Sequence, residues 1–306
     1  MKQTFKICRA SYWLTFLAYL IITSCNESPK NSNNTSETDS TQVANEVFKD
    51  STFDSKDLST IHICTELLPP SKNTPKESID TFYTKRKDGQ TDIRIQSVVV
   101  PTKAYITALT QYRWPLHTSI IKVTFLDGDT TVQRRVMETA KEWEKYCRIR
   151  FEYGKFDHPD ISISFEYTGS WSYIGTYSRE KSPSMNFGWL YKNTPQEEYD
   201  RVVLHEFGHA LGFVHEHQSP VSNIPWDTEK VYQYYMGPPN NWDKTTVDQN
   251  IFTKYNKGET QYTKFDTRSI MLYAIPAALT TNGFHTDPNS SLSSTDKEFV
   301  SSMYKK

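Results

Sequence analysis

The stretch LHEFGHALGFVHEH, residues 204–217, holds four of the eight histidines of this 306-residue chain. His205 and His209 are four residues apart, so a helix places both imidazoles on one face, where both can reach one metal ion. Gly212 can end that helix, because glycine readily takes the left-handed conformation found at helix ends. The turn brings back His215, which would supply a third nitrogen. The spacing therefore predicts a broken helix that carries a three-histidine metal site.

Three neutral ring nitrogens that leave one coordination position open are typical of a catalytic zinc site rather than a closed structural one. Glu206 follows the first histidine, close enough to hydrogen-bond a water on the ion without binding the ion itself. We therefore predict one catalytic Zn²⁺ ion with Glu206 as the general base. The alternative is a buried helix face whose histidines are satisfied by ordinary hydrogen bonds.

The pattern His205-Glu206-x-x-His209-x-x-Gly212-x-x-His215 resembles the zinc signature of the metzincin metalloproteases. The resemblance covers residues 113–306 and implies an α+β fold. That fold has a twisted mixed β-sheet, an active-site helix and a mostly irregular or helical C-terminal subdomain. The implied function is that of a zinc-dependent endopeptidase acting on proteins or peptides. A gluzincin, with a glutamate as third ligand, is disfavoured because His215 already fits.

A second motif, SIMLY at residues 269–273, resembles the metzincin turn in which a methionine lies beneath the zinc, here Met271. Tyr273 points to the astacin-like and serralysin-like branches. By that resemblance it would bind the resting zinc and then hydrogen-bond the reacting oxyanion; the alternative is a structural tyrosine. Glu216 suits astacins, but residues 218–220 read Gln-Ser-Pro and the astacin four-cysteine framework is missing. The chain is thus similar to an astacin-like bacterial branch.

Two other classes of function remain open. The first is a surface binding module that keeps a metalloprotease fold but does not cut. The second is a zinc enzyme that acts on a non-protein amide or ester. Nucleic acid is not an expected partner, because the formal net charge is −1 and there is no basic field. We expect a monomer.

Hydrophobic periodicity predicts several regular elements. Predicted strands cover residues 119–128, 160–167, 171–178 and 184–191, and predicted helices start near 130, 194, 229, 246 and 294. Thr130 or Thr131 is the expected N-cap of the first helix. Thr194 is the expected N-cap of the active-site helix, with Glu197 completing a capping box. The stretch Tyr173–Tyr177 is our candidate for the edge strand that binds an extended substrate.

The N-terminus predicts an export signal. Three basic residues precede an apolar run over residues 12–22, too short for a comfortable membrane span. The run ends in Ile-Thr-Ser-Cys at residues 22–25, which resembles a bacterial lipobox. We therefore expect residues 1–25 to be a signal peptide, with a lipid on Cys25 that anchors the exported protein to a bacterial membrane, at the periplasmic face or cell surface. A simple export signal with a chance cysteine is the alternative.

The region between this signal and the catalytic domain has two parts. Residues 26–60 are rich in Asn, Ser and Thr, so they predict a disordered tether. Residues 61–112 carry some apolar alternation and predict a pro-segment or an N-terminal extension. Cys64 and Cys147 can form one disulfide or remain two buried thiols. Some metzincin pro-segments use a cysteine as a thiolate plug on the zinc, and Cys64 is a further candidate for that role.

Other histidines and aromatic residues carry weaker predictions. His217 is expected near the ligands or at the surface rather than as a ligand itself. His62, His117, His158 and His285 are isolated and expected to be structural or exposed. Trp171 and its neighbours Tyr173 and Trp189 are expected in the core, with a cleft lining as the alternative.

Overall fold

The computed structural model describes residues 64–67, 79–85, 91–97, 112–238, 240–255 and 264–306. The chain divides into two units, residues 1–52 and 53–306, and every described residue belongs to the second. The predicted signal peptide, the predicted tether and His62 lie outside the described residues. Among the helices that the structure describes, none combines the length and apolarity required to cross a membrane.

Six strands form a mixed sheet in the order β1-β7-β8-β6-β4-β5. Its strands are β1 (Cys64–Leu67), β4 (Ile120–Phe125), β5 (Arg150–Tyr153), β6 (Ile161–Ser164), β7 (Ser170–Tyr173) and β8 (Met185–Phe187). β7 runs antiparallel to β8 and all other pairs are parallel. β2 (Ile79–Lys85) and β3 (Thr91–Ser97) form a separate antiparallel pair. The mixed sheet confirms the expected α+β class.

Helix α4 (Thr130–Glu144) follows β4 and has a different N-cap from the one expected. The cap is Asp129, whose carboxylate accepts a hydrogen bond from the Thr131 backbone N–H at 2.8 Å. The prediction of Thr130 or Thr131 was wrong, because an aspartate directly before them supplies a ready acceptor. Val136 and Trp143 on one face of the helix are fully buried, as helical spacing predicts.

Helix α5 (Gln196–Ala210) carries the histidine motif and starts without a side-chain cap. The expected capping box at Thr194 was wrong. The Thr194 hydroxyl instead accepts from the Tyr191 N–H and donates to the Trp189 carbonyl, so it closes the preceding turn. The predicted end of the helix is confirmed, since Gly212 has a φ of 98°. Only glycine adopts this conformation without strain.

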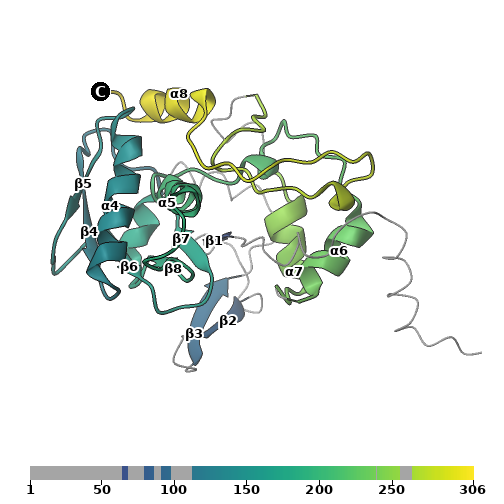
Figure 1. Cartoon of the computed structure of the whole chain (residues 1–306), viewed down its shortest axis with the longest axis horizontal. Helices are drawn as coiled ribbons and strands as arrows, with labels where there is room; N and C mark the ends of the chain where they lie inside the picture. The colour runs from purple at the N-terminus through teal and green to yellow at the C-terminus, as the bar shows by residue number, and fades with distance from the viewer. Residues whose placement is uncertain (1–63, 68–78, 86–90, 98–111, 239, 256–263) are drawn as a thin grey trace, which may run out of the picture. The chain divides into compact units, whose positions relative to one another are not determined.

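Two buried tryptophans and a tyrosine fix helix α5 in place. The Trp143 indole on α4 donates to the Leu204 carbonyl at 3.0 Å, and α4 lies beside α5 (Figure 1). At the C-terminal end, Trp114 donates to the Ala210 carbonyl at 2.7 Å. The Tyr304 hydroxyl donates to the Leu211 carbonyl, also at 2.7 Å. The bonds to Ala210 and Leu211 satisfy carbonyls that a helix end leaves unpaired, and the bond to Leu204 ties the middle of the helix to α4.

The stretch expected to form one strand over residues 171–178 divides in two. β7 ends at Tyr173, and residues Gly175–Glu180 form the 3₁₀ helix η2. The prediction that Tyr173–Tyr177 forms an edge strand was wrong, because only Tyr173 belongs to a strand and that strand, β7, pairs with both β1 and β8. Gly175 causes the break, because its φ is 48° and an added Cβ would lie 1.9 Å from the Tyr112 carbonyl oxygen.

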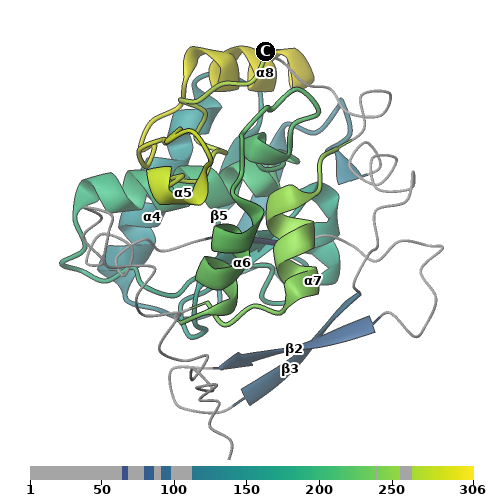
Figure 2. The same cartoon turned by 90° about the vertical axis from the view of Figure 1, so that its right-hand side faces the viewer.

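The chain after α5 is mostly irregular, as expected, with short helices. These are η3 (Glu216–Gln218), α6 (Thr228–Met236), α7 (Lys244–Val247), the π-helical η4 (Asp248–Phe252), η5 (Ala277–Leu279) and α8 (Ser294–Met303). Helices α6 and α7 lie side by side (Figure 2). The helices expected near residues 229, 246 and 294 are thereby confirmed.

Candidate metal centre

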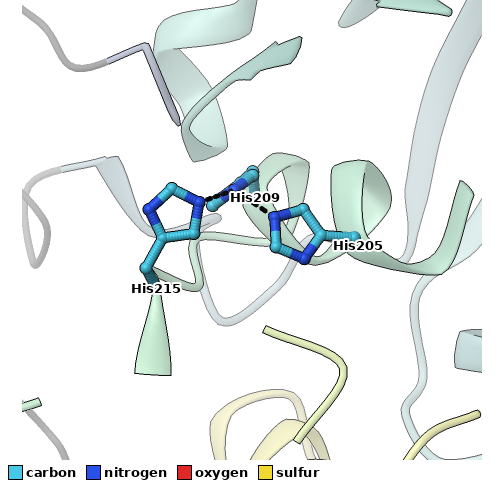
Figure 3. A group of neighbouring side chains, drawn as sticks. All are labelled: His205, His209 and His215. Carbon is cyan, nitrogen blue, oxygen red and sulfur yellow. Dashed lines mark hydrogen bonds between the residues drawn. The ribbon is translucent and has the colours of Figure 1, made fainter. Parts of the chain in front are cut away.

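The three histidines predicted as ligands converge in the structure. The Nε2 atom of His209 lies 3.2 Å from the Nε2 of His205 and 3.2 Å from the Nε2 of His215 (Figure 3). All three side chains are buried. His205 and His209 come from the last turns of α5, whereas His215 lies beyond the break at Gly212. The broken helix thus brings three imidazoles to one point.

Backbone carbonyls orient two of these rings. The Nδ1 of His205 lies 2.8 Å from the Ile270 carbonyl oxygen, and the Nδ1 of His209 lies 2.9 Å from the Phe213 carbonyl oxygen. A carbonyl only accepts, so each Nδ1 carries the proton and each Nε2 presents a lone pair. Burial lowers the pKa of His209 to about 4 and holds the pKa of His205 and of His215 well below the usual value. The rings are therefore neutral at pH 7.

This arrangement fits a bound cation. The Nε2 lone pairs of neutral His205 and His209 face one another at 3.2 Å and cannot hydrogen-bond, so this contact is repulsive by itself. Two nitrogens on one tetrahedral zinc ion, each about 2.0–2.1 Å from it, are separated by roughly 3.3 Å. Among the described residues, these three histidines are the group of possible ligands close enough to share an ion. The donor set suits Zn²⁺.

Glu206, the predicted general base, is fully buried on α5 beside this centre. Cys64 of β1 is its neighbour, and Cys64 is also buried at 2% exposure. Burial raises the pKa of the Cys64 thiol well above its usual value, and the Glu206 carboxylate raises it further. A residue expected in a pro-segment therefore lies at the metal centre.

Met271 lies beneath the helix that carries the ligands. A Cβ built on Gly208 of α5 would come 2.4 Å from the Met271 sulfur, so the thioether packs directly on the helix backbone. The turn is held by Asp296, which accepts from the Ser269 hydroxyl at 2.7 Å and from the Ile270 N–H at 2.8 Å. The structure therefore places Met271 where the sequence motif predicts it.

Tyr273 follows the turn and is stacked among the histidines. Its ring centroid lies 4.3 Å from that of His215 and 4.8 Å from that of His217. Its hydroxyl donates a hydrogen bond to the backbone carbonyl of Cys64. The phenol therefore reaches the strand that lies over the site.

Strand β1 covers the edge of the sheet beside the metal centre. Residues Cys64–Leu67 of β1 pair in parallel with Ser170–Tyr173 of β7, so Cys64 lies opposite Ser170 and Leu67 lies opposite Tyr173. A cavity of about 530 Å³ opens beside them, with Cys64, His205 and Tyr273 in its lining. Without β1, strand β7 would be the edge of the sheet. This edge is where an extended peptide can add by main-chain hydrogen bonds.

The structure also settles several residues that the sequence left open. Cys64 and Cys147 are both free, buried thiols rather than one disulfide. His217 is buried at 1% exposure and takes part in the site as a packing partner of Tyr273. Glu216 accepts a hydrogen bond from the Asp266 N–H at 2.9 Å. Trp171 and Tyr173 are buried in an aromatic cluster, whereas Trp189 is only partly buried. His117, His158 and His285 are exposed.

A mixed sheet, a broken helix with three converging histidines and a methionine turn beneath them define a metallopeptidase fold of the metzincin class. The family model described as Astacin, a peptidase family, matches residues 107–295, more than half of the chain. The chain belongs to the astacin family.

Two solved structures of myroilysin are similar to this chain. One is 45% identical, covers 65% of this chain and 98% of its own, and superposes with a TM-score of 0.63. The other is 36% identical, covers 81% of this chain and 93% of its own, and has a TM-score of 0.54. The second comparison reaches beyond the catalytic region of this chain.

Curated relatives come from animals. Zinc metalloproteinase nas-27 of Caenorhabditis elegans is 34% identical over 85 residues, 28% of this chain and 18% of that protein. Blastula protease 10 of Paracentrotus lividus is 28% identical over 161 residues, 50% of this chain and 23% of that protein. The chain thus spans about a fifth of the length of these two curated relatives.

Proposed function

We propose that the chain is a zinc-dependent endopeptidase in which His205, His209 and His215 hold one Zn²⁺ ion. The observation that carries this proposal is the convergence of three neutral imidazole nitrogens, with Nε2 atoms 3.2 Å apart, beside a buried glutamate. The family match to a peptidase supports the reaction class. The substrates we propose are proteins or peptides.

The chain's own groups divide the work of peptide hydrolysis. The bound Zn²⁺ supplies Lewis acidity, which makes a water acidic near neutral pH and polarises a carbonyl. Glu206 takes the proton of the attacking water and delivers it to the nitrogen of the leaving amine. The Tyr273 hydroxyl donates a hydrogen bond to the carbonyl oxygen as negative charge develops on it. Its present bond to the Cys64 carbonyl supports this, because that carbonyl is also a peptide carbonyl.

The substrate binds as an extended strand along β7. Main-chain hydrogen bonds on that edge are sequence-independent, whereas side-chain cavities beside it select residues. The cavity next to His205 and Tyr273 is of sufficient size, about 530 Å³, for one large side chain. β1 occupies the same edge, so a substrate and β1 compete for β7.

We propose further that residues 61–112 are a pro-segment and that β1 keeps the full chain inactive. Cys64 lies beside Glu206 and lines the cavity at the metal centre, which supports a role for its sulfur as a ligand at the open coordination position, with the thiol losing its proton as the metal binds. Its carbonyl engages Tyr273 at the same time. Proteolysis between β1 and the catalytic domain would release both contacts.

Substitution of Glu206 tests the catalytic proposal. Glu206→Gln should keep one zinc ion per chain and lose casein hydrolysis by about 10²- to 10⁴-fold, because general base catalysis contributes that much. Glu229→Gln, at an exposed position of α6 outside the lining of the cavity at the metal centre, is the matched control and should retain activity. Full activity in Glu206→Gln would reject the assigned base. Digestion that resists chelators would reject the zinc mechanism.

Cobalt(II) in place of zinc tests the pro-segment proposal without measuring catalysis. A cobalt-loaded full chain should show a thiolate-to-metal absorption band that Cys64→Ser removes and Cys147→Ser leaves intact, since both thiols are buried and free. The Cys64→Ser full chain should also hydrolyse casein faster than the wild-type full chain. An unchanged band in Cys64→Ser would exclude the thiolate contact.

Export and lipid attachment at Cys25 remain part of the proposal. The motif at residues 22–25 and the polar stretch after it support a tethered protein displayed outside the bacterial cytoplasm. Mass spectrometry of the N-terminal peptide from membranes should find a diacylglycerol on Cys25. A protein cleaved elsewhere and found only in the medium would contradict this anchor.

A further inference from the structure

His217 lies two residues after the last proposed ligand but does not face the metal centre as a ligand. Its Nε2 donates a hydrogen bond to the Asn250 carbonyl at 2.7 Å, so the nitrogen best able to reach an ion is already used. The ligand group of the described residues contains the other three buried histidines only. Metal binding therefore does not explain why the His217 ring is buried.

The face of the His217 ring is stacked on Tyr273. The two ring centroids are 4.8 Å apart and the planes meet at 28°. His215 contacts the same phenol, with centroids 4.3 Å apart and planes at 48°. The centroids of His215 and His217 are themselves 5.3 Å apart, so Tyr273 contacts both rings of a stacked pair, one a proposed metal ligand and one a non-ligand. The exposure of Tyr273 is only 8%.

His217 is itself fixed from three sides. Asn250 belongs to η4, so the hydrogen bond ties the ring to a helix more than thirty residues away. Trp226 packs against it at 89°, with centroids 6.5 Å apart. The Ser222 hydroxyl donates to the His217 carbonyl at 2.6 Å. Because these contacts hold His217 in place, its ring presents a fixed plane to Tyr273, which stacks on it.

We propose that His217 is a positioning residue for Tyr273: its ring fixes the plane in which the phenol lies and so aims the hydroxyl at the reacting carbonyl. This inference rests on the proposed function, in which that hydroxyl stabilises the developing oxyanion. Without the His217 ring, the Tyr273 side chain would have room for other rotamers. The fraction of molecules whose Tyr273 hydroxyl points at the reacting carbonyl would then fall. Aromatic stacking of this kind corresponds to a change of about two- to tenfold in a population.

Two substitutions separate the ring face from the hydrogen bond. His217→Gln keeps a donor near the Nε2 position for the Asn250 carbonyl and removes the ring, whereas His217→Phe keeps a ring and removes the donor. With proteolytically activated protein, His217→Gln should lower kcat for peptide hydrolysis by about three- to tenfold with little change in KM. His217→Phe should remain within about twofold of wild type. Equal losses in the two variants would overturn the proposal.

A double-mutant cycle shows whether His217 acts through the phenol. In the Tyr273→Phe background the hydroxyl is gone, so His217→Gln should have no further effect on kcat. The same fold-loss in both backgrounds would mean that His217 only supports packing, and would overturn the proposal.

A readout independent of catalysis uses the metal-free full chain. When Cys147 is replaced by serine, Cys64 is the free thiol that remains among the described residues, so a thiol reagent measures its accessibility. The Tyr273 hydroxyl donates a hydrogen bond to the backbone carbonyl of Cys64. His217→Gln should speed the reaction of Cys64 with Ellman's reagent several-fold over His217→Phe, because the misaligned phenol holds β1 less well. Equal rates would contradict the positioning role. If neither the wild-type protein nor any variant hydrolyses peptides, the proposed function is rejected. The rate of reaction with Ellman's reagent does not depend on hydrolysis, so it still decides the role of His217.

Discussion

The sulfur of Met271 rests on the backbone of Gly208, one residue before the ligand His209. A Cβ added to Gly208 would lie 2.4 Å from that sulfur and 3.3 Å from the Met271 methyl carbon. The turn beneath the metal centre and the helix above it therefore approach as closely as a glycine allows. Because both His205 and His209 belong to this helix, the contact fixes the distance between these two proposed ligands and the methionine turn.

Gly208→Ala should therefore destabilise the protein, although alanine is the better helix former by about 1 kcal/mol. Overpacking of a close contact costs about 1–3 kcal/mol, which outweighs the gain in helix propensity. Urea unfolding monitored by tryptophan fluorescence measures the difference. Met271→Ala in the Gly208→Ala background opens the space again, so the cost of Gly208→Ala should shrink in that background. A Gly208→Ala protein more stable than wild type would refute the close contact.

Asp296 connects the last helix to the methionine turn. Its carboxylate accepts from the Ser269 hydroxyl, the Ile270 N–H and the Ser293 N–H, the last within a capping box of α8. Asp296→Ala leaves buried donors unpaired, each costing about 1–3 kcal/mol. We expect the free energy of unfolding to fall by about 3 kcal/mol or more. Glu298→Ala, exposed on the same helix, should change it by less than about 0.5 kcal/mol.

Tyr304 closes the C-terminal end of helix α5. Its hydroxyl donates to the Leu211 carbonyl at 2.7 Å, and the whole side chain is buried. Tyr304→Phe keeps the packing and removes this bond, so we expect a loss of about 1–2 kcal/mol in unfolding free energy. The matched control is Tyr146→Phe, which removes a partly buried bond of 3.3 Å to Glu142. Similar losses of unfolding free energy in the two variants would show that the bond from Tyr304 to the helix end stabilises the protein no more than the partly buried bond of Tyr146.

Metal removal should lower thermal stability. The buried Nε2 lone pairs of His205 and His209 repel one another when no cation neutralises them, and an ion that binds only the folded state stabilises it. At free zinc 100-fold above the dissociation constant, the stabilisation is about 2.7 kcal/mol. Differential scanning calorimetry should show a lower unfolding temperature after chelation and recovery when zinc is restored. An unfolding temperature that ignores both steps would argue against a site in the folded protein.

The convergence of the three proposed ligands could be predicted from sequence because its geometry is local. His205 and His209 are one helical turn apart, and the left-handed Gly212 between them and His215 is a backbone requirement that the residue type reveals. Met271 could be placed by its motif for the same reason. The mixed sheet and the helix that crosses it followed from the family resemblance.

What could not be predicted depends on contacts between distant parts of the chain. β1 pairs with β7 across more than one hundred residues, so the position of Cys64 beside Glu206 does not follow from local sequence, and only the resemblance to metzincin pro-segments suggested Cys64 as a candidate at the zinc. His217 owes its burial to Asn250 and Tyr273, neither of which is near it in sequence. The capping errors were of another kind, since Asp129 competed with its threonine neighbours for one position.

The central claim is that three imidazoles bind one catalytic zinc ion, and metal analysis of purified variants tests it most directly. We predict one zinc per chain in the wild-type protein and in Glu206→Gln, and a large loss of zinc in His215→Ala, whose side chain completes the group. Circular dichroism should show that His215→Ala remains folded. Zinc retained at one per chain in a folded His215→Ala protein would contradict the account.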